Sequence, residues 1–498
     1  MEETINKKYT KVNYSPETIG TKSKKRYDII VIGCGSAGLS VGLFMTKVGF
    51  NVLMVSRSDR AIGGDCLNDG CVPSKAFIHA AKIVHSAKAA SRIGLQITGE
   101  VDIKRVTDYV YDKQEVIREH ENAAWLKQQG IDVALGFAKF TGSNEIEVEG
   151  ERFSGKKIVI ATGSRPRKLQ VPGVEQVRYF DNENIFRLAQ LPKKLLVIGG
   201  GPIGIEIAQA MSRLGSKVTV VEQGNSLLMH DDEAVTEVLQ QRLQQEGLTF
   251  LFGVELKQFT SANSVEIIRE NKTTTIEVDA VFVAIGRQLT IEGLQLEKAG
   301  VELKDGKIVV SDYLQTSNKN IYVCGDVAGG LQFSHAAEYH ARILLNNFFS
   351  PLKKKVNYDH ISWVTFTDPE VATFGLSEKQ LKEKNISYIR LNQDFDDDDR
   401  AVVDQYQYGR MVLFISKKKL FSKQKIVGGT MIAPHAGELI QELILANATG
   451  LSINEIFNKI YPYPVASRIN QKAILQYKQQ SVTEGLKKLL RFAFKLFS

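Results

Sequence analysis

The 498-residue sequence predicts an α/β fold in which one supersecondary unit occurs twice and is followed by a separate α+β domain. Short apolar runs alternate with helix-like stretches, as in layered folds with parallel strands. A pattern of strand, glycine turn, helix and strand begins near residue 27 and recurs near residue 195. From residue 351 onward, strand-like and helical segments alternate without that pattern, which predicts the third domain.

The first unit begins with an apolar strand over residues 27–32, and Gly33, Gly35 and Gly38 follow it at once. An amphipathic helix to residue 48 and a second strand over residues 51–55 complete the unit. Glycines in the spacing Gly-x-Gly-x-x-Gly permit a tight turn and a close approach of the backbone to a pyrophosphate at the helix N-terminus. This unit therefore predicts a dinucleotide site.

The second unit has the same order of parts. A strand over residues 195–198 runs into Gly199, Gly201 and Gly204, and a helix to residue 214 leads to a strand over residues 217–221. A single glycine turn is a weak signal, but a strand before and a helix after it, seen twice, are strong. The sequence thus predicts two Rossmann-like dinucleotide-binding domains.

Cys66 and Cys71 are five positions apart in a glycine-bounded segment before a helix-like stretch over residues 75–90. The first turn of a helix lowers the pKa of a thiol, and a pair this close can cycle between dithiol and disulfide. Two small buried residues or half of a metal site are the alternatives. A zinc site needs two further ligands, and Cys34 and Cys324 each stand alone, so we predict no metal site.

Composition narrows the class of protein. With 43% hydrophobic and 24% charged residues, the chain is expected to be globular and soluble. Four cysteines are too few for a secreted disulfide scaffold, and a close pair among them favours a reducing compartment, hence the cytoplasm. The sequence contains no run of 18 apolar residues that could span a membrane. The polar residues 1–27 resemble neither a secretory signal nor a transit peptide.

The net charge of +8 is concentrated at the two ends. Residues 1–26 hold seven Lys and Arg against three Glu, and residues 485–498 hold four Lys and Arg with no acid. A nearly neutral body argues against nucleic acid as a partner. Residues 485–497 predict an amphipathic helix, which could lie on an anionic surface at the inner face of the membrane or dock on its own domain.

The order of these features resembles the flavoprotein pyridine nucleotide–disulfide oxidoreductases, which include dihydrolipoamide dehydrogenase, glutathione reductase and mercuric reductase. The first glycine turn, Cys-x4-Cys, Ala161-Thr162-Gly163, the second glycine turn and Gly325-Asp326 carry the resemblance, which covers roughly residues 27–475. It implies FAD and NAD(P)H as cofactors and a homodimer. It also implies six segments: a basic N-terminal extension (1–26), an FAD-binding domain in two parts (27–165 and 287–350), an NAD(P)-binding domain (166–286), a dimerisation domain (351–480) and a basic amphipathic tail (481–498).

The resemblance assigns cofactor contacts in both nucleotide domains. In the FAD-binding domain the expected contacts are Gly33, Gly35, Ser36, Gly38, Ser56, Gly64, Asp65, Lys75, Ala138, Thr162, Gly163, Ser164, Gly325, Asp326, Ser334 and His335. In the NAD(P)-binding domain they are Gly199, Gly201, Gly204, Glu222, Leu256 and Gly286. Asp326 is expected to bond the ribitol, and His335 to be structural rather than catalytic.

The resemblance also assigns catalytic roles. Cys71 is expected to be the thiolate next to the flavin, and Cys66 the outward thiol that attacks the acceptor. Lys75 lies four residues beyond Cys71 and is expected to pair with Glu206. Glu222 ends the second strand of its unit, where a carboxylate bonds ribose hydroxyls and repels a 2′-phosphate, so NADH is favoured over NADPH.

The sequence departs from the family pattern in three places. Ser56 stands where an acid usually contacts the FAD ribose, and Leu289-Thr290 replaces the usual Pro-Asn. Tyr463 and Arg468 replace the His and Glu that act as acid and base across the dimer. A tyrosine is a poor base at neutral pH, so classical dihydrolipoamide dehydrogenase or glutathione reductase activity is disfavoured.

A tyrosine at position 463 is typical of the mercuric reductase branch. Those enzymes also use two C-terminal cysteines and an N-terminal metal-binding domain, neither of which this sequence contains. We therefore expect a mercuric reductase-like, FAD-dependent NAD(P)H:acceptor oxidoreductase of the disulfide or metal-ion reductase type, whose small-molecule or metal-ion acceptor is not identified. The alternatives are a metal-ion or quinone reductase that works without thiol exchange, and a non-catalytic FAD-binding redox sensor or scaffold.

Overall fold

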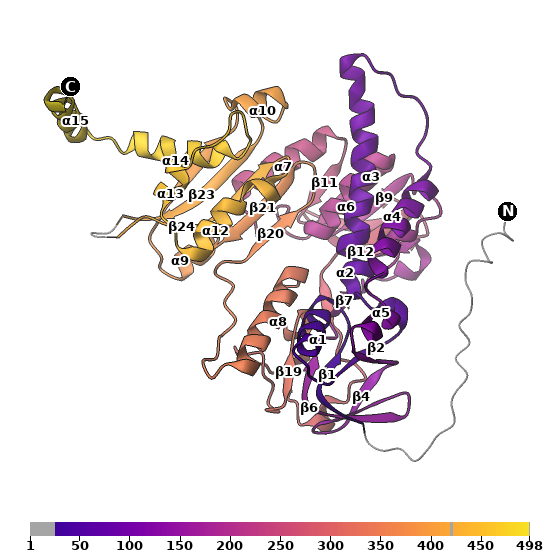
Figure 1. Ribbon diagram of the computed structural model, residues 1–498. Coiled ribbons are helices and arrows are strands. Elements are labelled where there is room, and N and C mark those ends of the chain that lie inside the picture. Colours follow the sequence, from indigo (N-terminus) through magenta and orange to yellow (C-terminus); the bar gives the residue numbers. More distant parts are fainter. Residues whose placement is uncertain (1–24, 419–421, 498) are drawn as a thin grey trace.

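The computed structural model describes residues 25–418 and 422–497 (Figure 1). The first nucleotide-binding unit lies beside the second, and the C-terminal domain packs against both. Most of the predicted basic N-terminal extension lies outside the described residues, and its last two residues already belong to strand β1 (Lys25–Ile32). No helix in the described part of the chain is long and apolar enough to cross a membrane.

The first unit is built on a mixed seven-stranded sheet. Its central strands are parallel, and Ile32 of β1 pairs with Val55 on one side and with Ile160 on the other. The last strand to join comes from beyond the second unit, so the first unit is discontinuous along the chain. The strands are β3 (Asp132–Leu135), β2 (Val52–Ser56), β1, β6 (Glu151–Ile160), β5 (Glu145–Val148), β4 (Ala138–Gly142) and, paired with β6, β19 (Ile321–Val323).

The helices of the first unit carry the predicted dithiol. They are α1 (Ser36–Lys47), α2 (Gly64–Asn68), α3 (Cys71–Ala89), α4 (Ile103–Arg118), α5 (Ala123–Gln128) and α8 (Ser334–Phe349). The helix expected from residue 75 therefore begins four residues earlier, at Cys71 itself. Pro73 does not interrupt it, because a proline in the first turn has no intrahelical hydrogen bond to lose. Cys66 lies in the short helix α2 rather than in a loop.

The second unit has a parallel five-stranded sheet with helix α6 (Pro202–Leu214) after its glycine turn, followed along the chain by helix α7 (Glu233–Gln245). In spatial order its strands are β11 (Thr249–Phe252), β10 (Lys217–Glu222), β9 (Lys194–Ile198), β15 (Ala280–Val283) and β8 (Tyr179–Phe180). A small antiparallel sheet adjoins it, formed by β12 (Glu255–Ser261), β13 (Ser264–Arg269) and β14 (Lys272–Glu277).

The chain crosses between the two units along a pair of short strands. These are β7 (Ser164–Pro166) and β16 (Arg287–Leu289), which pair in antiparallel fashion. The position 165/166 lies inside β7, and the position 286/287 lies directly before β16.

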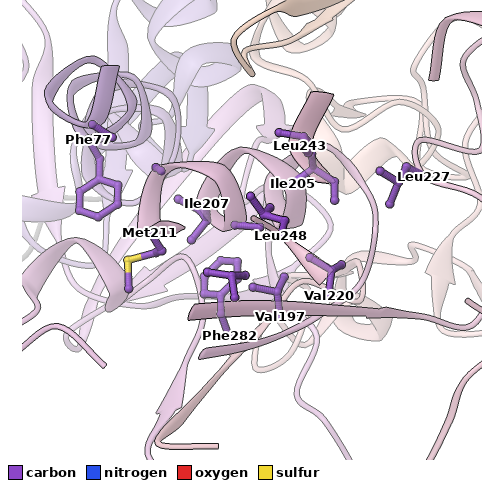
Figure 2. Close-up of a cluster of buried hydrophobic side chains, with 14 of the residues drawn as sticks. Phe77, Val197, Ile205, Ile207, Met211, Val220, Leu227, Leu243, Leu248 and Phe282 are labelled. Atoms are coloured by element: carbon purple, nitrogen blue, oxygen red, sulfur yellow. The ribbon is translucent and has the colours of Figure 1, made fainter. Parts of the chain in front are cut away.

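One hydrophobic core joins the two units (Figure 2). Phe77 of α3 belongs to the same buried cluster as Met211 of α6 and as Val197 and Phe282 of the second sheet. Its ring meets that of Phe186 edge-on at 6.0 Å. Burial of these side chains fixes α3, which carries Cys71, against α6, which carries Glu206.

The C-terminal domain is a five-stranded antiparallel sheet with helices on it. Its strands in spatial order are β20 (Ser362–Thr365), β21 (Glu370–Gly375), β24 (Ile426–Ala433), β23 (Arg410–Ser416) and β22 (Tyr388–Asp394). Its helices are α9 (Glu378–Glu383), α10 (Asp399–Val403), α11 (Ala436–Leu439), α12 (Gln441–Thr449), α13 (Ile453–Asn458), α14 (Arg468–Gln480) and α15 (Glu484–Phe497). Helices α11 and α12 meet at Ile440.

Candidate functional site

In both predicted glycine turns, the first and third glycines leave no room for a side chain. A Cβ on Gly33 would lie 2.2 Å from the Ala161 carbonyl oxygen, and one on Gly38 would lie 2.0 Å from the Gly33 carbonyl oxygen. The second turn repeats this packing, with corresponding distances of 2.4 Å for Gly199 and 2.1 Å for Gly204. Helices α1 and α6 start directly after these turns, so their first free N–H groups point at the space beyond the strand ends.

Cys66 and Cys71 are free thiols whose acidities differ. A hydrogen bond from Cys66, with help from the Ser334 hydroxyl and the Lys75 ammonium, lowers the pKa of Cys71 to about 6 although burial opposes this. The same hydrogen bond, together with burial, raises the pKa of Cys66. Cys71 is also the first residue of α3, where the helix dipole favours a negative charge. At neutral pH the pair therefore holds its proton on Cys66 and its charge on Cys71.

Ser334 joins the dithiol to helix α8. Its hydroxyl oxygen lies 3.3 Å from the Cys71 sulfur, and it is the first residue of α8. The Phe333 ring beside it stacks on His335 at 5.3 Å and on Trp363 at 6.4 Å. Burial lowers the pKa of His335, so this imidazole is neutral at physiological pH. The stack is consistent with the structural role expected for His335.

The predicted ion pair between Lys75 and Glu206 is present. The Lys75 ammonium lies 2.8 Å from Glu206 Oε2 and 4.4 Å from the centre of the Phe366 ring. The other carboxylate oxygen of Glu206 accepts a 2.8 Å hydrogen bond from the Phe366 backbone N–H. The Glu206 side chain is only 6% exposed, against 37% for Lys75. The carboxylate is thus fixed from two domains, and it holds the ammonium on the face of α3 that carries Cys71.

Arg213, which the sequence analysis did not single out, anchors the same junction. It lies on α6 seven residues after Glu206, and its guanidinium, with a side chain 4% exposed, donates to both oxygens of Glu246 at 2.7 and 2.8 Å. It also donates to the side chain and the carbonyl oxygen of Asp368 at 3.0 and 3.1 Å. A charged residue on the apolar face of a helix is a sequence signal that could have revealed it.

Arg287 brings together three of the predicted cofactor contacts. The Ser164 hydroxyl donates to Asp326 at 2.6 Å and accepts from Arg287 Nε at 2.7 Å. The same guanidinium lies 3.1 Å from the Asp65 carboxylate. Burial raises the pKa of Asp326. Arg287 follows Gly286, a predicted cofactor contact, at the crossing between the two units.

Three other residues that were predicted to contact the flavin form hydrogen bonds or are buried within the protein itself. Ser56 is buried, and its hydroxyl donates to the Ser58 carbonyl at 2.8 Å, which leaves the oxygen only as an acceptor. Ala138 is buried at the start of β4. The Thr162 hydroxyl donates to the Thr290 carbonyl at 2.5 Å, so the segment that lacks Pro-Asn is tied to the Ala-Thr-Gly turn.

The Glu222 carboxylate stands beside the second glycine turn. It accepts hydrogen bonds from the backbone N–H of Gly200 at 2.6 Å and of Gly224 at 2.7 Å. The Val254 N–H donates to the Glu222 carbonyl oxygen at 3.1 Å, which brings the strand of Leu256 to the same end of the sheet. The carboxylate is therefore held in place at the edge of the predicted nicotinamide nucleotide site.

Tyr463 and Arg468 contact each other in the C-terminal domain. The Arg468 guanidinium lies 5.4 Å from the centre of the Tyr463 ring, and the Tyr463 hydroxyl donates to Asp399 at 3.0 Å. That hydrogen bond raises the pKa of Tyr463. The sequence analysis overlooked Tyr461, whose half-buried hydroxyl donates to Glu442 at 2.5 Å and whose pKa is raised by burial. Neither phenol is poised to act as a base at neutral pH.

Comparison with known proteins decides the family. The family model described as pyridine nucleotide-disulphide oxidoreductase matches residues 27–341, and that of the dimerisation domain of the same family matches residues 361–474. The chain belongs to this family. The predicted family, fold class and general function are thereby confirmed: this oxidoreductase is an FAD-dependent disulfide oxidoreductase with a C-terminal dimerisation domain, which supports a homodimer.

Named relatives are similar over most of the chain. A mercuric reductase from Lysinibacillus sphaericus is 32% identical, with 90% of this chain and 82% of that protein covered. A dihydrolipoyl dehydrogenase from Thermus scotoductus is 34% identical, with 89% and 95% covered. Among solved structures, the HOCl-induced flavoprotein disulfide reductase RclA from Escherichia coli superimposes with a TM-score of 0.79 at 26% identity, covering 89% of this chain and 98% of its own.

The residues of this oxidoreductase fit FAD. A Cβ on Gly64 would lie 2.6 Å from the Gly35 Cα, so two backbone turns press together at the start of α1 without side chains between them. The partly buried Asp326 carboxylate accepts a hydrogen bond from Ser164, lies 3.9 Å from Arg287 Nε, and retains further acceptor capacity for a hydroxyl-rich ligand. Within residues 25–418 and 422–497, no group of three or more His, Cys, Asp or Glu side chains could hold a metal ion.

Proposed function

We propose that this oxidoreductase uses NADH to reduce the Cys66–Cys71 disulfide and passes the electrons from the dithiol to a thiophilic metal ion. The observation that carries the proposal is the asymmetry of the pair, in which Cys71 has a pKa of about 6 and Cys66 keeps its proton. When bound, FAD supplies the transfer of two electrons from NADH to sulfur. Lys75, held by Glu206, and Ser334 stabilise the thiolate that results.

The reaction balances in two halves. A hydride equivalent from NADH opens the disulfide and leaves one thiol, on Cys66, and one thiolate, on Cys71. A divalent mercury ion then takes two electrons from the dithiol, the disulfide forms again, and the Cys66 proton is released; two Cu²⁺ ions can take the same two electrons. Cys71, and not Cys66 as predicted, is the more exposed of the two thiols in this structure. Cys66 is still the sulfur that meets the acceptor in this proposal, because Ser334 and Lys75 hold Cys71 as the thiolate.

The residue at the acid–base position of the family indicates the class of acceptor. Reduction of an ordinary disulfide needs an acid to protonate the departing thiolate, and the family position for it holds Tyr463, whose pKa is raised by its bond to Asp399. A metal ion needs no such proton. The mercuric reductases among the relatives support this class, as does a Cu(II) complex of Escherichia coli RclA.

The preference for NADH is part of the proposal. Glu222 is fixed by two backbone N–H groups where the adenosine ribose is expected, and a carboxylate there favours hydroxyls over a 2′-phosphate.

We further propose that Tyr463 of one protomer faces the dithiol of its partner across the homodimer.

The test compares acceptors in wild type and in Cys66→Ser, with NADH oxidation as the readout. Hg²⁺ or Cu²⁺ buffered by a thiol, oxidised lipoamide, a soluble quinone and ferricyanide are supplied in turn. We expect metal-dependent turnover that falls by about a hundredfold or more in Cys66→Ser, whereas ferricyanide, a one-electron acceptor, retains its rate. Oxidised lipoamide should turn over about a hundredfold more slowly than the metal, as expected without an acid catalyst.

The second candidate is reduction of a metal ion or quinone without thiol exchange. The raised pKa of Tyr463 favours this second candidate, because a tyrosine with a raised pKa is a poor acid–base partner for the dithiol. Full metal or quinone turnover in Cys66→Ser would establish this candidate and reject the first. Rapid lipoamide turnover in wild type would reject both.

A further inference from the structure

Helix α15 stands apart from the rest of the described chain. It covers Glu484–Phe497 and follows α14 after a connection of three residues, 481–483. None of its residues is buried, and it packs against no other helix or strand of residues 25–418 and 422–497 to any substantial extent. Figure 1 shows it projecting from the end of the C-terminal domain opposite the nucleotide-binding units.

The apolar side chains of α15 occupy more than half of its circumference. At about 100° per residue, nine consecutive angular positions around the helix carry no polar side chain. In that angular order they are Phe492, Gly485, Leu496, Leu489, Ala493, Leu486, Phe497, Leu490 and Phe494. The seven large ones are exposed in the structure, from 39% for Leu486 to 85% for Phe497. A helix that packs on a protein surface usually buries a narrower stripe.

The remaining arc of α15 is basic. Lys487, Lys488, Arg491 and Lys495 occupy it together with one acid, Glu484. The Glu484 carboxylate pairs with Lys487 at 2.6 Å, at the first turn of the helix. Four cations and one carboxylate give the helix a net charge of +3. Lys488 and Lys487 lie at the two borders of the apolar arc, and the other two cations lie between them.

We propose that α15 binds the surface of an anionic lipid bilayer, with its axis in the plane of the membrane. A bilayer can accept the whole broad apolar arc, whereas a single partner helix covers only a seam of it. The cations then lie at the level of the acidic headgroups, which complements the charge of the arc. The helix has 14 residues and is too short to span the hydrocarbon core. This proposal does not depend on the redox reaction of the dithiol.

The test is co-sedimentation of the full-length FAD holoenzyme with vesicles at physiological salt. Phosphatidylcholine vesicles are compared with vesicles that contain 30% phosphatidylglycerol. We expect binding to the anionic vesicles and little to the neutral ones. Leu490→Asp with Phe497→Asp should abolish binding, and Lys488→Gln with Lys495→Gln should weaken it about thirtyfold, from the contribution of about two basic residues. Flavin content and ferricyanide turnover check that each variant is folded.

The matched control for the charge variant is Lys379→Gln with Lys304→Gln, which removes two exposed lysines outside α15 and should leave binding unchanged. Equal loss in this control would overturn the assignment to α15. Light scattering after size exclusion decides between the other occupants. A species larger than a dimer that dissociates in Leu490→Asp with Phe497→Asp, without vesicle binding by wild type, would show that α15 instead joins copies of the chain. A wild-type dimer without vesicle binding would also overturn the proposal.

Discussion

The Cys71 sulfur lies 3.3 Å from the Ser334 hydroxyl, although 263 positions separate these residues in the chain. The contact joins the two parts of the discontinuous first domain, because Cys71 begins α3 and Ser334 begins α8. A hydroxyl donor and a helix start thus meet at one sulfur, and both favour its thiolate form. The chemistry of the dithiol depends on this junction as much as on the spacing of the two cysteines.

The Cys71 thiolate should persist to about pH 6. The thiolate-dependent long-wavelength absorbance of the two-electron-reduced enzyme is expected to lose half its amplitude near that pH, because the pKa of Cys71 is lowered to about 6. Ser334→Ala should move this midpoint upward by about one pH unit, the equivalent of one lost hydrogen bond. An anaerobic pH titration checks both values. A wild-type midpoint near the ordinary thiol value of about 8.5 would contradict the asymmetry.

Glu206→Gln should destabilise the junction of α3 and α6 modestly. The substitution removes one charge of a pair whose carboxylate is buried and whose ammonium is 37% exposed, so solvent screening reduces the loss to about 1–2 kcal/mol. The amide can still accept from the Phe366 N–H. Urea unfolding of the holoenzyme measures the change, with the exposed Glu237→Gln on α7 as a control that should differ little from wild type. Equal stability of the two variants would show that the pair contributes nothing.

Arg213→Met should be the more damaging change. It removes the guanidinium between Glu246 and Asp368, which leaves the 12% exposed Glu246 carboxylate without its cation while Asp368 keeps Lys82 at 3.2 Å, a loss of about 3 kcal/mol. The free energy of unfolding measures this directly. Met keeps most of the apolar stem, so a loss below about 1 kcal/mol, the range of a surface pair, would mean that water compensates the carboxylates.

NADH should be a better substrate than NADPH by at least about tenfold in kcat/KM, because we propose that the Glu222 carboxylate lies beside the adenosine ribose, where its negative charge would repel a 2′-phosphate. Glu222→Gln removes the charge but keeps an oxygen that can accept one of the two backbone N–H groups. We expect this variant to lower the ratio of kcat/KM with NADH to kcat/KM with NADPH severalfold, mainly through a lower KM for NADPH. Steady-state kinetics with ferricyanide as acceptor measure the ratio without the dithiol. An unchanged ratio would place specificity elsewhere.

Tyr463→His with Arg468→Glu should create disulfide reductase activity. The double variant restores the acid–base pair of the family at positions where the chain has a phenol with a raised pKa and a guanidinium. We expect turnover of oxidised lipoamide to rise by about tenfold or more, and each single variant to gain less. Assays of NADH oxidation with lipoamide follow the gain. Wild-type turnover equal to that of the double variant would show that the chain already has another acid.

The sequence predicted the framework well because its signals are local. The glycine turn between a strand and a helix needs a backbone conformation that favours glycine. Gly33 and Gly199 show this, because both have a positive φ and no space for a Cβ. The pairing of Lys75 with Glu206 was also correct, although it rested on a family resemblance. Helix limits were less accurate, since Pro73 concealed that α3 begins at Cys71.

The contacts that tune the site could not be read from sequence. Ser334, Arg213 and Arg287 act on residues more than 30 positions away, through packing of helices and strands that spacing does not reveal. The acidity of a thiol depends on these neighbours and on burial, not on the residue type. Tyr461 with Glu442 was missed for the same reason.

The most direct test of the central claim is anaerobic titration of the purified flavoprotein with NADH, in wild type, Cys71→Ser and Cys66→Ser. The account predicts a long-wavelength thiolate absorbance after one equivalent in wild type, none in Cys71→Ser, and one in Cys66→Ser even before NADH is added, because its Cys71 is then a free thiolate. If the band survives in Cys71→Ser, or if NADH does not reduce the wild-type protein, Cys71 is not the thiolate through which this oxidoreductase works.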